Sequence, residues 1–500
     1  INPKGTLCMP IVAYGTAMGW ISPYKELLMG PSSPSSPALS EDDVSWMASI
    51  MFIFAPIAVF IYGVAADKFG RKNALLCASV PISLGWAVKL ICTHPIALIG
   101  ARALIGFGSG GAFVVCPLYV KEISEDSIRG MTGTFVIFSQ TVGNLLMFVL
   151  GDQLPFNTVL WILLAIPLIH FCFLLRLPET PSYLVKCGRT EVSDGVGHTF
   201  SLPPARTGAE TAKVLGWLRS VPPTDKSISE EVDRLRVEHT TSELKFSPRL
   251  LCKLNCGCGI IQLRYRSTVA DKTALKAFWV ALVVNLTREF CGCIAVLVYA
   301  SHIFRAAGAG TPLTANQQST VLAAVQILGS FTACQLVDRL GRKPLLAVTS
   351  AVAGCSMCLL GAWFYLQTGG AGPAGALPGW VPVAALCTCI FADAAGLQPL
   401  PFVIMTEMFS FQLRGTVATL IMAISLGTDF ALLKLFAPLI TWIGYHSTFW
   451  IFSAICLANV FYLILCVPET KMRSLEDIYA DLEGRNKGKK NGTVVETNHV

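Results

Sequence analysis

Runs of about twenty apolar residues recur along the whole chain, and they constrain its fold more than any other feature. A helix of that length crosses roughly 30 Å of hydrocarbon. About twelve such runs are present, separated by short loops and one long polar stretch. Only 14% of the residues are charged, whereas soluble domains carry about 25%. The sequence therefore predicts an all-α membrane protein with twelve transmembrane helices.

A charged turn between the second and third apolar runs has a near copy between the eighth and ninth runs. The first reads Asp67-Lys-Phe-Gly70-Arg71-Lys72. The second reads Asp338-Arg-Leu-Gly341-Arg342-Lys343. Glycine at the same place in both copies permits a tight turn where a Cβ atom would clash. This duplication predicts two related halves with six helices each.

Two further elements repeat in the same order. Glu122 precedes Arg129-Gly130 after the fourth run, and Glu407 precedes Arg414-Gly415 with the same spacing after the tenth. Pro-Glu-Thr follows the sixth run at Glu179 and the twelfth run at Glu469. Three elements that repeat in order indicate two parallel six-helix units related by an axis along the membrane normal.

The predicted domains follow from these repeats. They are an N-terminal six-helix half (1–177), a cytoplasmic middle loop (178–271) with short helices at Ala212–Arg219 and Ser229–Leu244, a C-terminal six-helix half (272–467) and a cytoplasmic tail (468–500). Lys and Arg concentrate in alternate short loops, which places those loops and both termini in the cytoplasm. This topology explains the net charge of +7 better than nucleic-acid binding does.

The expected location is the plasma membrane, with the lipid bilayer as surroundings. The first residue is Ile1 rather than Met, which is typical of a trimmed N-terminus, and no cleavable signal peptide is expected. Eighteen cysteines are present, and most lie in apolar runs, where cysteine behaves as a small hydrophobic residue. No disulfide framework is therefore predicted.

Together these motifs resemble the sugar porter family of the major facilitator superfamily, and the resemblance extends over nearly all spans. Further matching motifs are Arg102 with Gly106 and Gly108, Pro117-x-Tyr119-x-x-Glu122, Pro399-x-Pro401 and Pro468-Glu-Thr-Lys471. Gly19-Trp-Ile-Ser-Pro23 and Gly396-Leu-Gln-Pro-Leu-Pro-Phe402 look most like the branch of facilitated trehalose transporters. The resemblance implies the major facilitator fold, a central cavity, alternating access and a sugar such as trehalose or a hexose as the solute.

The first span favours facilitated diffusion over proton coupling. Proton-coupled members of the family carry an acidic residue just after Gly-Tyr in this span. Here Gly19-Trp20 is followed by Ile21. The resemblance therefore implies a uniporter, although Asp393 or Asp429 would offer a different proton site.

The repeated charges are predicted to form a cytoplasmic gate. Arginine binds a carboxylate through directional hydrogen bonds, so a cluster that forms when the two halves close inside would hold the outward-open state. The alternative is a signal for membrane orientation, with solvated ion pairs that are worth little individually. The predicted gate residues are Asp67, Arg71, Glu122, Arg129, Glu179, Asp338, Arg342, Glu407, Arg414 and Glu469.

The predicted substrate site departs from the family pattern. Sugar hydroxyls need paired donors and acceptors, which amide side chains supply. Ile137 stands where the family has a glutamine in the fifth span, whereas Gln326 keeps an amide in the eighth span. The predicted substrate-binding residues are Gln140, Arg288, Glu289, Gln326, Phe402, Ser425 and Asp429.

Charged residues stand inside several spans, namely Arg288, Glu289, Asp393, Asp429 and Lys434. A charge there costs at least about 2.5 kcal/mol and marks either a site or an ion pair. Consecutive helical residues point about 100° apart, so Arg288 and Glu289 are not expected to face each other. Arg288 is predicted to pair with Asp429 or Asp393. A structural ion pair, a site for a polar or charged solute, and a degenerate protein that transports nothing are the open readings.

No enzyme, cofactor or metal site is predicted, because the sequence shows no nucleophile–base set, no metal-ligand set and no phosphate loop. Cys252-x-x-x-Cys256-x-Cys258 in the middle loop is a weak metal or palmitoylation motif that lacks a nearby histidine, and reduced thiols are favoured there. Two alternative functions stay open. One is a carrier for another polar or charged solute, and the other is a nutrient sensor that transports nothing.

Overall fold

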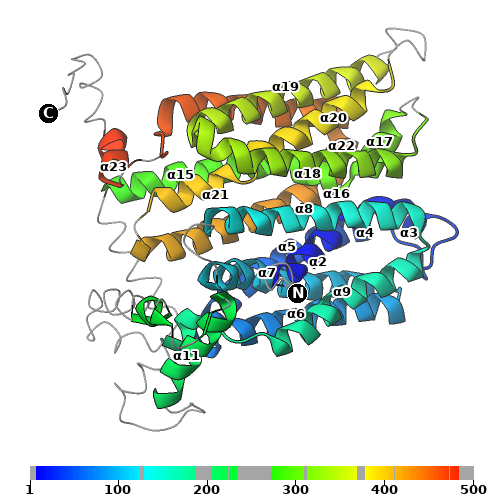
Figure 1. Cartoon of the computed structure of the whole chain (residues 1–500). Coiled ribbons are helices and arrows are strands. Elements are labelled where there is room, and N and C mark those ends of the chain that lie inside the picture. The colour runs from blue at the N-terminus through cyan, green and yellow to red at the C-terminus, as the bar shows by residue number, and fades with distance from the viewer. Residues whose placement is uncertain are drawn as a thin grey trace, which may run out of the picture. The chain divides into compact units, whose positions relative to one another are not determined.

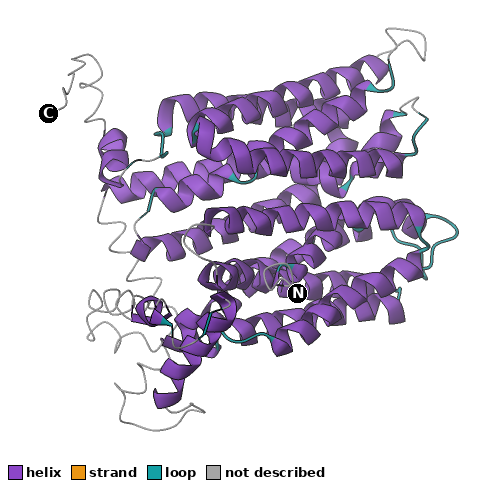
Figure 2. Cartoon of the chain, in the orientation of Figure 1, coloured by secondary structure: helices purple, strands orange, loops and turns teal. Residues whose placement is uncertain are grey.

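The computed structural model describes residues 7–123, 129–185, 204–219, 221–222, 225–226, 228–233, 272–308, 312–368, 378–409, 411–471, 473 and 475–483. Within these ranges all regular structure is helical, as Figure 2 shows. The helices are α2 (Met9–Gly19), α3 (Ile21–Met29), α4 (Glu41–Ser49), α5 (Met51–Phe69), α6 (Arg71–Ile91), α7 (Pro95–Ile123), α8 (Arg129–Gln153), α9 (Phe156–Arg176), α11 (Pro204–Arg219), α15 (Lys272–Phe290), α16 (Cys293–Val298), α17 (Ala300–Ala307), α18 (Ala315–Leu340), α19 (Arg342–Thr368), α20 (Val381–Ala392), the π-helix η2 (Asp393–Leu397), α21 (Leu400–Glu407), α22 (Phe411–Cys466) and α23 (Leu475–Glu483).

Nine helical stretches of the described residues are long and apolar enough to cross a membrane. One of them, Val417–Cys466, is counted once although the backbone of α22 leaves the helical conformation at Gly444, where φ is 79°. Dividing α22 there and including the α2–α3 pair and α8 accounts for the twelve predicted spans, which are labelled in Figure 1.

The chain divides into two compact units. The first comprises Ile1–Gly259, Ile294–Ile327 and Asp429–Pro438. The second comprises Ile260–Cys293, Leu328–Thr428 and Leu439–Val500. The first unit therefore includes two segments of the predicted C-terminal half. The domain boundaries drawn from the sequence at 177, 271 and 467 stay predictions.

In the first unit, α7 packs against α5 and α6, and α2 packs against α8. Small residues on α7 permit the close approach to α5. A Cβ atom added at Gly106 or Gly110 would lie 2.5 Å from backbone atoms of Met51 and Ala55, respectively. Backbones that approach this closely are typical of helix pairs in membranes, where van der Waals packing rather than hydrophobicity drives association.

Local sequence also sets several helix ends in the first unit. Ser40 accepts a hydrogen bond from the backbone N–H of Asp43 at 3.2 Å, and the Asp43 carboxylate accepts one from the Ser40 N–H at 3.0 Å. This reciprocal capping box begins α4. Helix α17 ends at Gly308, which adopts the left-handed conformation with φ 58°.

In the second unit, α19 packs against α20 and η2, and α15 packs against α21 and α23. The tail helix α23 is fixed to the beginning of α15 by two polar contacts. Thr273 donates to the Glu483 carboxylate at 2.6 Å, and Lys276 donates to the Leu482 carbonyl. This part of the predicted tail therefore belongs to the folded unit.

The middle loop contains helix, as predicted, in its described part. The predicted helix Ala212–Arg219 lies within α11, which starts earlier, at Pro204. The predicted helix Ser229–Leu244 is helical from residue 228 to 233, and its remainder lies outside the described residues. Leu215 of α11 packs against Ile228 and Val232. The Cys252–Cys258 motif lies outside the described residues.

Candidate functional site

The turn between α5 and α6 is closed by a carboxylate from the loop after α9. Gly70 has φ 98°, and the backbone N–H groups of Arg71 and Lys72 each donate to Glu179 at 3.1 Å. A Cβ atom at Gly70 would lie 2.3 Å from Glu179 Oε2, so glycine is required for this approach. The carboxylate thus sits at the N-terminus of α6, where the unsatisfied N–H groups and the helix dipole favour negative charge.

The side chain of Arg71 extends this contact to α7. Its Nε donates to Glu122 Oε1 at 3.0 Å, and its Nη1 donates to the Ala66 carbonyl at 3.0 Å. Asp67 lies 3.4 Å from Arg71 Nη2 and is largely exposed. Arg71 therefore connects the end of α5, the start of α6 and the end of α7.

The turn between α18 and α19 has the same geometry. Gly341 has φ 94°, and the backbone N–H groups of Arg342 and Lys343 donate to Glu469 at 3.1 and 3.2 Å. Arg342 Nε donates to Glu407 Oε1 at 3.2 Å, and Arg342 Nη1 donates to the Val337 carbonyl at 3.0 Å. The repeat seen in the sequence is thus also a repeat of these four hydrogen bonds.

The second copy has contacts that the first lacks, among them a hydrogen bond from the Lys471 N–H to Glu469 Oε1 at 3.0 Å, where the first copy has Pro181. Thr470 donates its hydroxyl to Glu407 Oε2 at 2.6 Å, so both carboxylate oxygens of Glu407 have partners. In the first copy, Glu122 Oε2 is buried without a hydrogen-bond partner among the described residues. The two networks therefore share the same main hydrogen bonds, but Glu407 has partners for both carboxylate oxygens and Glu122 for one.

Burial raises the pKa of Glu179 above its ordinary value, although the N–H groups of Thr180, Lys72 and Arg71 and the charge of Arg71 oppose this shift. The structure brings seven of the ten predicted gate residues into these two networks. The side chains of Arg129, Asp338 and Arg414 lie outside the described ones. Within these two networks, the described ion pairs join residues of the same predicted half, and a cluster between the halves stays a prediction.

One predicted binding residue of the first unit, Gln326, belongs to a buried amide pair. Asn144 Nδ2 of α8 donates to Gln326 Oε1 of α18 at 3.2 Å, and both side chains are buried. Gln140 is buried and donates toward the sulfur of Met18 at 3.5 Å. Asn144 was not predicted from the sequence, although it lies one helical turn beyond Gln140 on the same face of α8. Asp429 is also buried.

In the second unit, Arg288 pairs with its neighbour Glu289. Their Nη1 and Oε1 atoms are 2.7 Å apart, and Glu289 is 2% exposed. The prediction that these two side chains do not face each other is wrong, because the guanidinium of Arg288 reaches the Glu289 carboxylate. Pairing of Arg288 with Asp429 stays a prediction, because the two residues belong to different units.

The remaining predicted binding residues of the second unit are a ring and a hydroxyl. Phe402 on α21 is half-buried, and Ser425 on α22 is buried. No contact described for either side chain assigns it to a solute. Both stay predictions as binding residues.

Lys434 was predicted to be a charge within a span, and it lies in α22, inside a stretch long and apolar enough to cross a membrane. Its Nζ forms an ion pair with Asp42 Oδ1 at 2.6 Å, at the exposed first turn of α4. The ammonium also lies 4.3 Å from the centre of the Trp46 ring. The sequence did not predict this pair because its residues are nearly four hundred positions apart.

The sequence analysis did not identify two buried cationic side chains as charges within the spans. Lys89 is fully buried, with its Nζ 3.5 Å from the centre of the Trp20 ring and 4.2 Å from that of Trp86. Arg102, noted only as a family motif, is fully buried and donates to the carbonyls of Met47 and Ala17. Each stands in an apolar run, where one charge barely changes the pattern.

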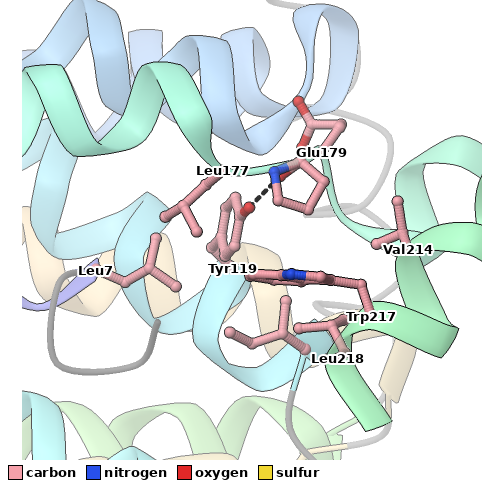
Figure 3. A pocket seen from close by; sticks show the side chains of 9 residues that line it. Leu7, Tyr119, Leu177, Glu179, Val214, Trp217 and Leu218 are labelled. Carbon is pink, nitrogen blue, oxygen red and sulfur yellow. Dashed lines mark hydrogen bonds between the residues drawn. The ribbon is translucent and has the colours of Figure 1, made fainter. Parts of the chain in front are cut away.

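A small pocket lies where α11 meets the end of α7, as Figure 3 shows. Tyr119 of α7 donates its hydroxyl to the Pro178 carbonyl at its rim. Trp217 and Val214 of α11 cover it from the other side. The middle-loop helix is therefore packed against the same loop that carries Glu179.

Cys291, Cys293 and Asp393 are buried and bring one possible metal-ligating atom each within 4.8 Å of one another. The sequence analysis did not predict this set. Cys291-x-Cys293 gives a partial signal in the sequence, but the approach of Asp393 depends on the packing of two distant spans.

Comparisons with known proteins agree with this architecture. A family model described as "Sugar (and other) transporter" matches residues 15–482. Facilitated trehalose transporters Tret1 from Aedes aegypti and Culex quinquefasciatus are each 27% identical over 447 residues, or 89% of this chain. The match spans 50% of the Aedes protein and 79% of the Culex protein.

Solved structures show the fold. The inward-open conformation of the xylose transporter XylE from E. coli superposes with a TM-score of 0.71 at 18% identity. The match covers 96% of this chain and 98% of that one. The twelve helices therefore form the major facilitator fold, with two related six-helix halves.

Proposed function

Because the chain belongs to the sugar transporter family, we propose that it carries an uncharged sugar across a membrane by facilitated diffusion. The proposed solute is a disaccharide such as trehalose, or a hexose. The trehalose transporters among the relatives support this class of solute. The family is one of transporters and not of enzymes.

The observation that carries the proposal is the duplicated network at the two turns. Glu179 and Glu469 each bind the start of a helix through its backbone, while Arg71 and Arg342 each bind a glutamate on a neighbouring helix. Because the same hydrogen bonds connect the helix ends in both halves, each half behaves as a rigid body around its turn. Two rigid bodies that rock about a central site are the basis of alternating access.

The charges inside the spans favour an uncharged solute. Arg288 is neutralised by Glu289 at 2.7 Å, so the pair offers no net charge to a ligand. The amides of Asn144 and Gln326 supply both donors and acceptors, which is what sugar hydroxyls require. The alternative of a carrier for a charged solute has no comparable support.

The gate is part of the same proposal. When the two halves close on the cytoplasmic side, Arg129 and Arg414 complete the clusters around Glu122 and Glu407. Solute-driven rocking then breaks those contacts. The proposed location is the plasma membrane, with both termini in the cytoplasm.

The proposal is tested by solute flux in proteoliposomes. Purified protein is expected to equilibrate radiolabelled trehalose or glucose across the bilayer, and unlabelled solute inside is expected to accelerate entry by counterflow. Lack of flux for any sugar, in protein that remains folded, would contradict a carrier and favour the nutrient sensor.

A variant pair assigns the flux to the amide site. Gln326→Leu leaves the Asn144 amide without its partner, which costs about 1–3 kcal/mol, and is expected to reduce the uptake rate about tenfold. Thr332→Ala is the matched control on α18, because its hydroxyl bonds only within the helix, to the Leu328 carbonyl. Equal rates for both variants would remove Gln326 from the site.

A further inference from the structure

A cluster of thiols surrounds the interruption between α15 and α16. Cys291 and Cys293 flank Gly292, which has φ 82°, and their Sγ atoms are 3.3 Å apart. A Cβ atom at Gly292 would lie 2.4 Å from the Phe452 ring, so this turn is tightly enclosed. Both cysteines are buried, with exposures of 1% and 4%.

The tenth span supplies the other side of this cluster. Cys389 near the end of α20 has its Sγ 3.7 Å from that of Cys293. Asp393, one helical turn later, is the first residue of the π-helix η2. Its Oδ1 atom is buried and has no hydrogen-bond partner in the described part of the chain. Cys456 of α22 is a further buried cysteine of this unit.

The donor set fits a thiophilic divalent cation. Zn²⁺ prefers four tetrahedral ligands drawn from thiolate, imidazole and carboxylate, at Zn–S distances of about 2.3 Å. Those bonds place neighbouring sulfurs about 3.8 Å apart, close to the 3.3 and 3.7 Å observed. Mg²⁺ and Ca²⁺ are disfavoured because they select oxygen ligands. A disulfide is not present, because its sulfurs would be about 2.05 Å apart.

We propose that Cys291, Cys293, Cys389 and Asp393 form a binding site for Zn²⁺, with Cd²⁺ as its spectroscopic substitute. Each thiol that binds the ion releases its proton to the solvent, and Asp393 binds as the carboxylate. The site needs no oxidant and no change in the oxidation state of sulfur.

The ion would connect two interrupted spans. Cys291 and Cys293 lie at the break in the seventh span, and Cys389 and Asp393 lie where the α-helix of the tenth span changes to a π-helix. π-Helical turns are frequent at functional sites. A metal bridge between these breaks restricts their relative motion. We therefore expect Zn²⁺ to inhibit flux, an effect that rests on the proposed transport, whereas binding itself does not.

Binding is tested on the full-length protein after reduction and chelation, in detergent, by titration with Cd²⁺. The wild type is expected to bind a single ion with the ultraviolet charge-transfer band of thiolate-bound cadmium and with release of protons. Absence of that band in the wild type overturns the proposal, whether or not any variant folds. A Cys291–Cys293 disulfide that persists after reduction and prevents binding also overturns it.

Variants locate the ion. The Cys291→Ser/Cys293→Ser double variant is expected to lose the band, and Asp393→Asn is expected to weaken binding by more than about tenfold. Cys387→Ser is the matched control, because this half-buried cysteine stands on α20 two residues before Cys389. A band of equal strength in the double variant would overturn the assignment.

The effect on transport is measured separately. Zn²⁺ is expected to slow sugar flux in the wild type and in Cys387→Ser, and to leave the residual flux of the double variant unchanged. If cadmium binds but Zn²⁺ does not inhibit flux, the proposal that the ion restricts motion between the two spans is wrong, while the proposed binding site stands. Absence of sugar flux in every protein would contradict the proposed function, while the cadmium titration would still decide the site.

Discussion

Two glycines hold the same positive-φ backbone conformation at matched places in the repeat. Gly70 has φ 98° and Gly341 has φ 94°. Side chains of other residues are strained in this region of φ. The sequence predicted the turns because glycine, which has no Cβ atom, permits the backbone conformation that a tight turn needs. It did not predict that the glutamates of the two Pro-Glu-Thr motifs would fill the space left by the missing side chains.

Gly70→Ala is expected to destabilise the protein by about 1–3 kcal/mol, because of the backbone strain and the clash with Glu179. Gly63→Ala is the matched control on α5, because no atom lies within 4 Å of its new Cβ. That variant is expected to be neutral, or to gain up to about 1 kcal/mol as alanine replaces glycine in a helix. Thermal unfolding in detergent measures both, and equal stability of the two variants would contradict the argument.

The pH dependence of stability is expected to report Glu179. Its folded pKa lies above the ordinary value of 4.5, so the folded protein binds the proton more tightly than the unfolded chain does. As the pH falls through the folded pKa towards 4.5, the wild type should therefore gain stability relative to Glu179→Gln. Thermal unfolding across that window tests the sign. Glu210→Gln, an exposed change on α11, is the control and should show no such trend.

Lys89→Met is expected to stabilise the protein by about 1–3 kcal/mol. The Lys89 ammonium is fully buried and has ring contacts but no hydrogen-bond partner among the described residues. Burial of such a charge costs several kcal/mol, while a desolvated cation–π contact returns about 2. Lys68→Met removes an exposed ammonium over the Phe69 ring and should change little. Loss of stability in Lys89→Met would reveal an additional partner for this lysine.

At the scale of elements, hydropathy predicted the seventh and tenth spans but not the interruptions within them. The structure breaks the seventh span at Gly292 and inserts a π-helix in the tenth. An apolar run has the same composition whether its backbone is continuous or broken, so the breaks were not predictable from hydropathy. The thiol cluster was missed for the same reason, because its members meet only through those breaks.

Helix α11 gives the prediction that belongs to this scale. Arg219 donates to the Ile123 carbonyl at the end of α7 at 3.1 Å and pairs with Glu231 at 2.8 Å. Arg219→Ala is expected to cost about 1–3 kcal/mol of local stability, because the carbonyl and the carboxylate lose a charged partner. Hydrogen exchange of residues 204–219 should accelerate correspondingly, by about tenfold or more. Lys213→Ala, an exposed change on α11, should leave exchange unchanged, and equal rates in both variants would contradict this docking contact.

At the scale of the molecule, the apolar runs predicted twelve helices, and three short repeats predicted their division into two related halves. Arg71 and Arg342 confirm the duplication in their hydrogen bonds. Individual pairings were less predictable. Arg288 pairs with Glu289 and Lys434 with Asp42, because long side chains choose partners that helix spacing does not specify. The helices and their division into two halves were therefore more predictable from the sequence than the individual ion pairs.

Energetic coupling is tested on the whole transporter. Because Ile21 stands where proton-coupled members carry an acid, the sugar concentration inside proteoliposomes is expected to reach that outside and no more. A proton gradient or a protonophore should change neither the final level nor the initial rate. Liposomes without protein are the control for leakage. Accumulation above the external concentration that collapses with the gradient would establish a symporter and contradict uniport.

Glu179 and Glu469 recognise main-chain N–H groups of the residues after each turn glycine, not their side chains. At the second of those positions any amino acid except proline presents the same donor. Exchange of Lys72 or Lys343 would therefore keep the backbone hydrogen bond to the carboxylate, while the side-chain hydrogen bonds to the carbonyls of Leu175 and Ile464 would be lost. Distant relatives that lack a basic residue there would still share the contact, provided that they retain the glycine and the acid.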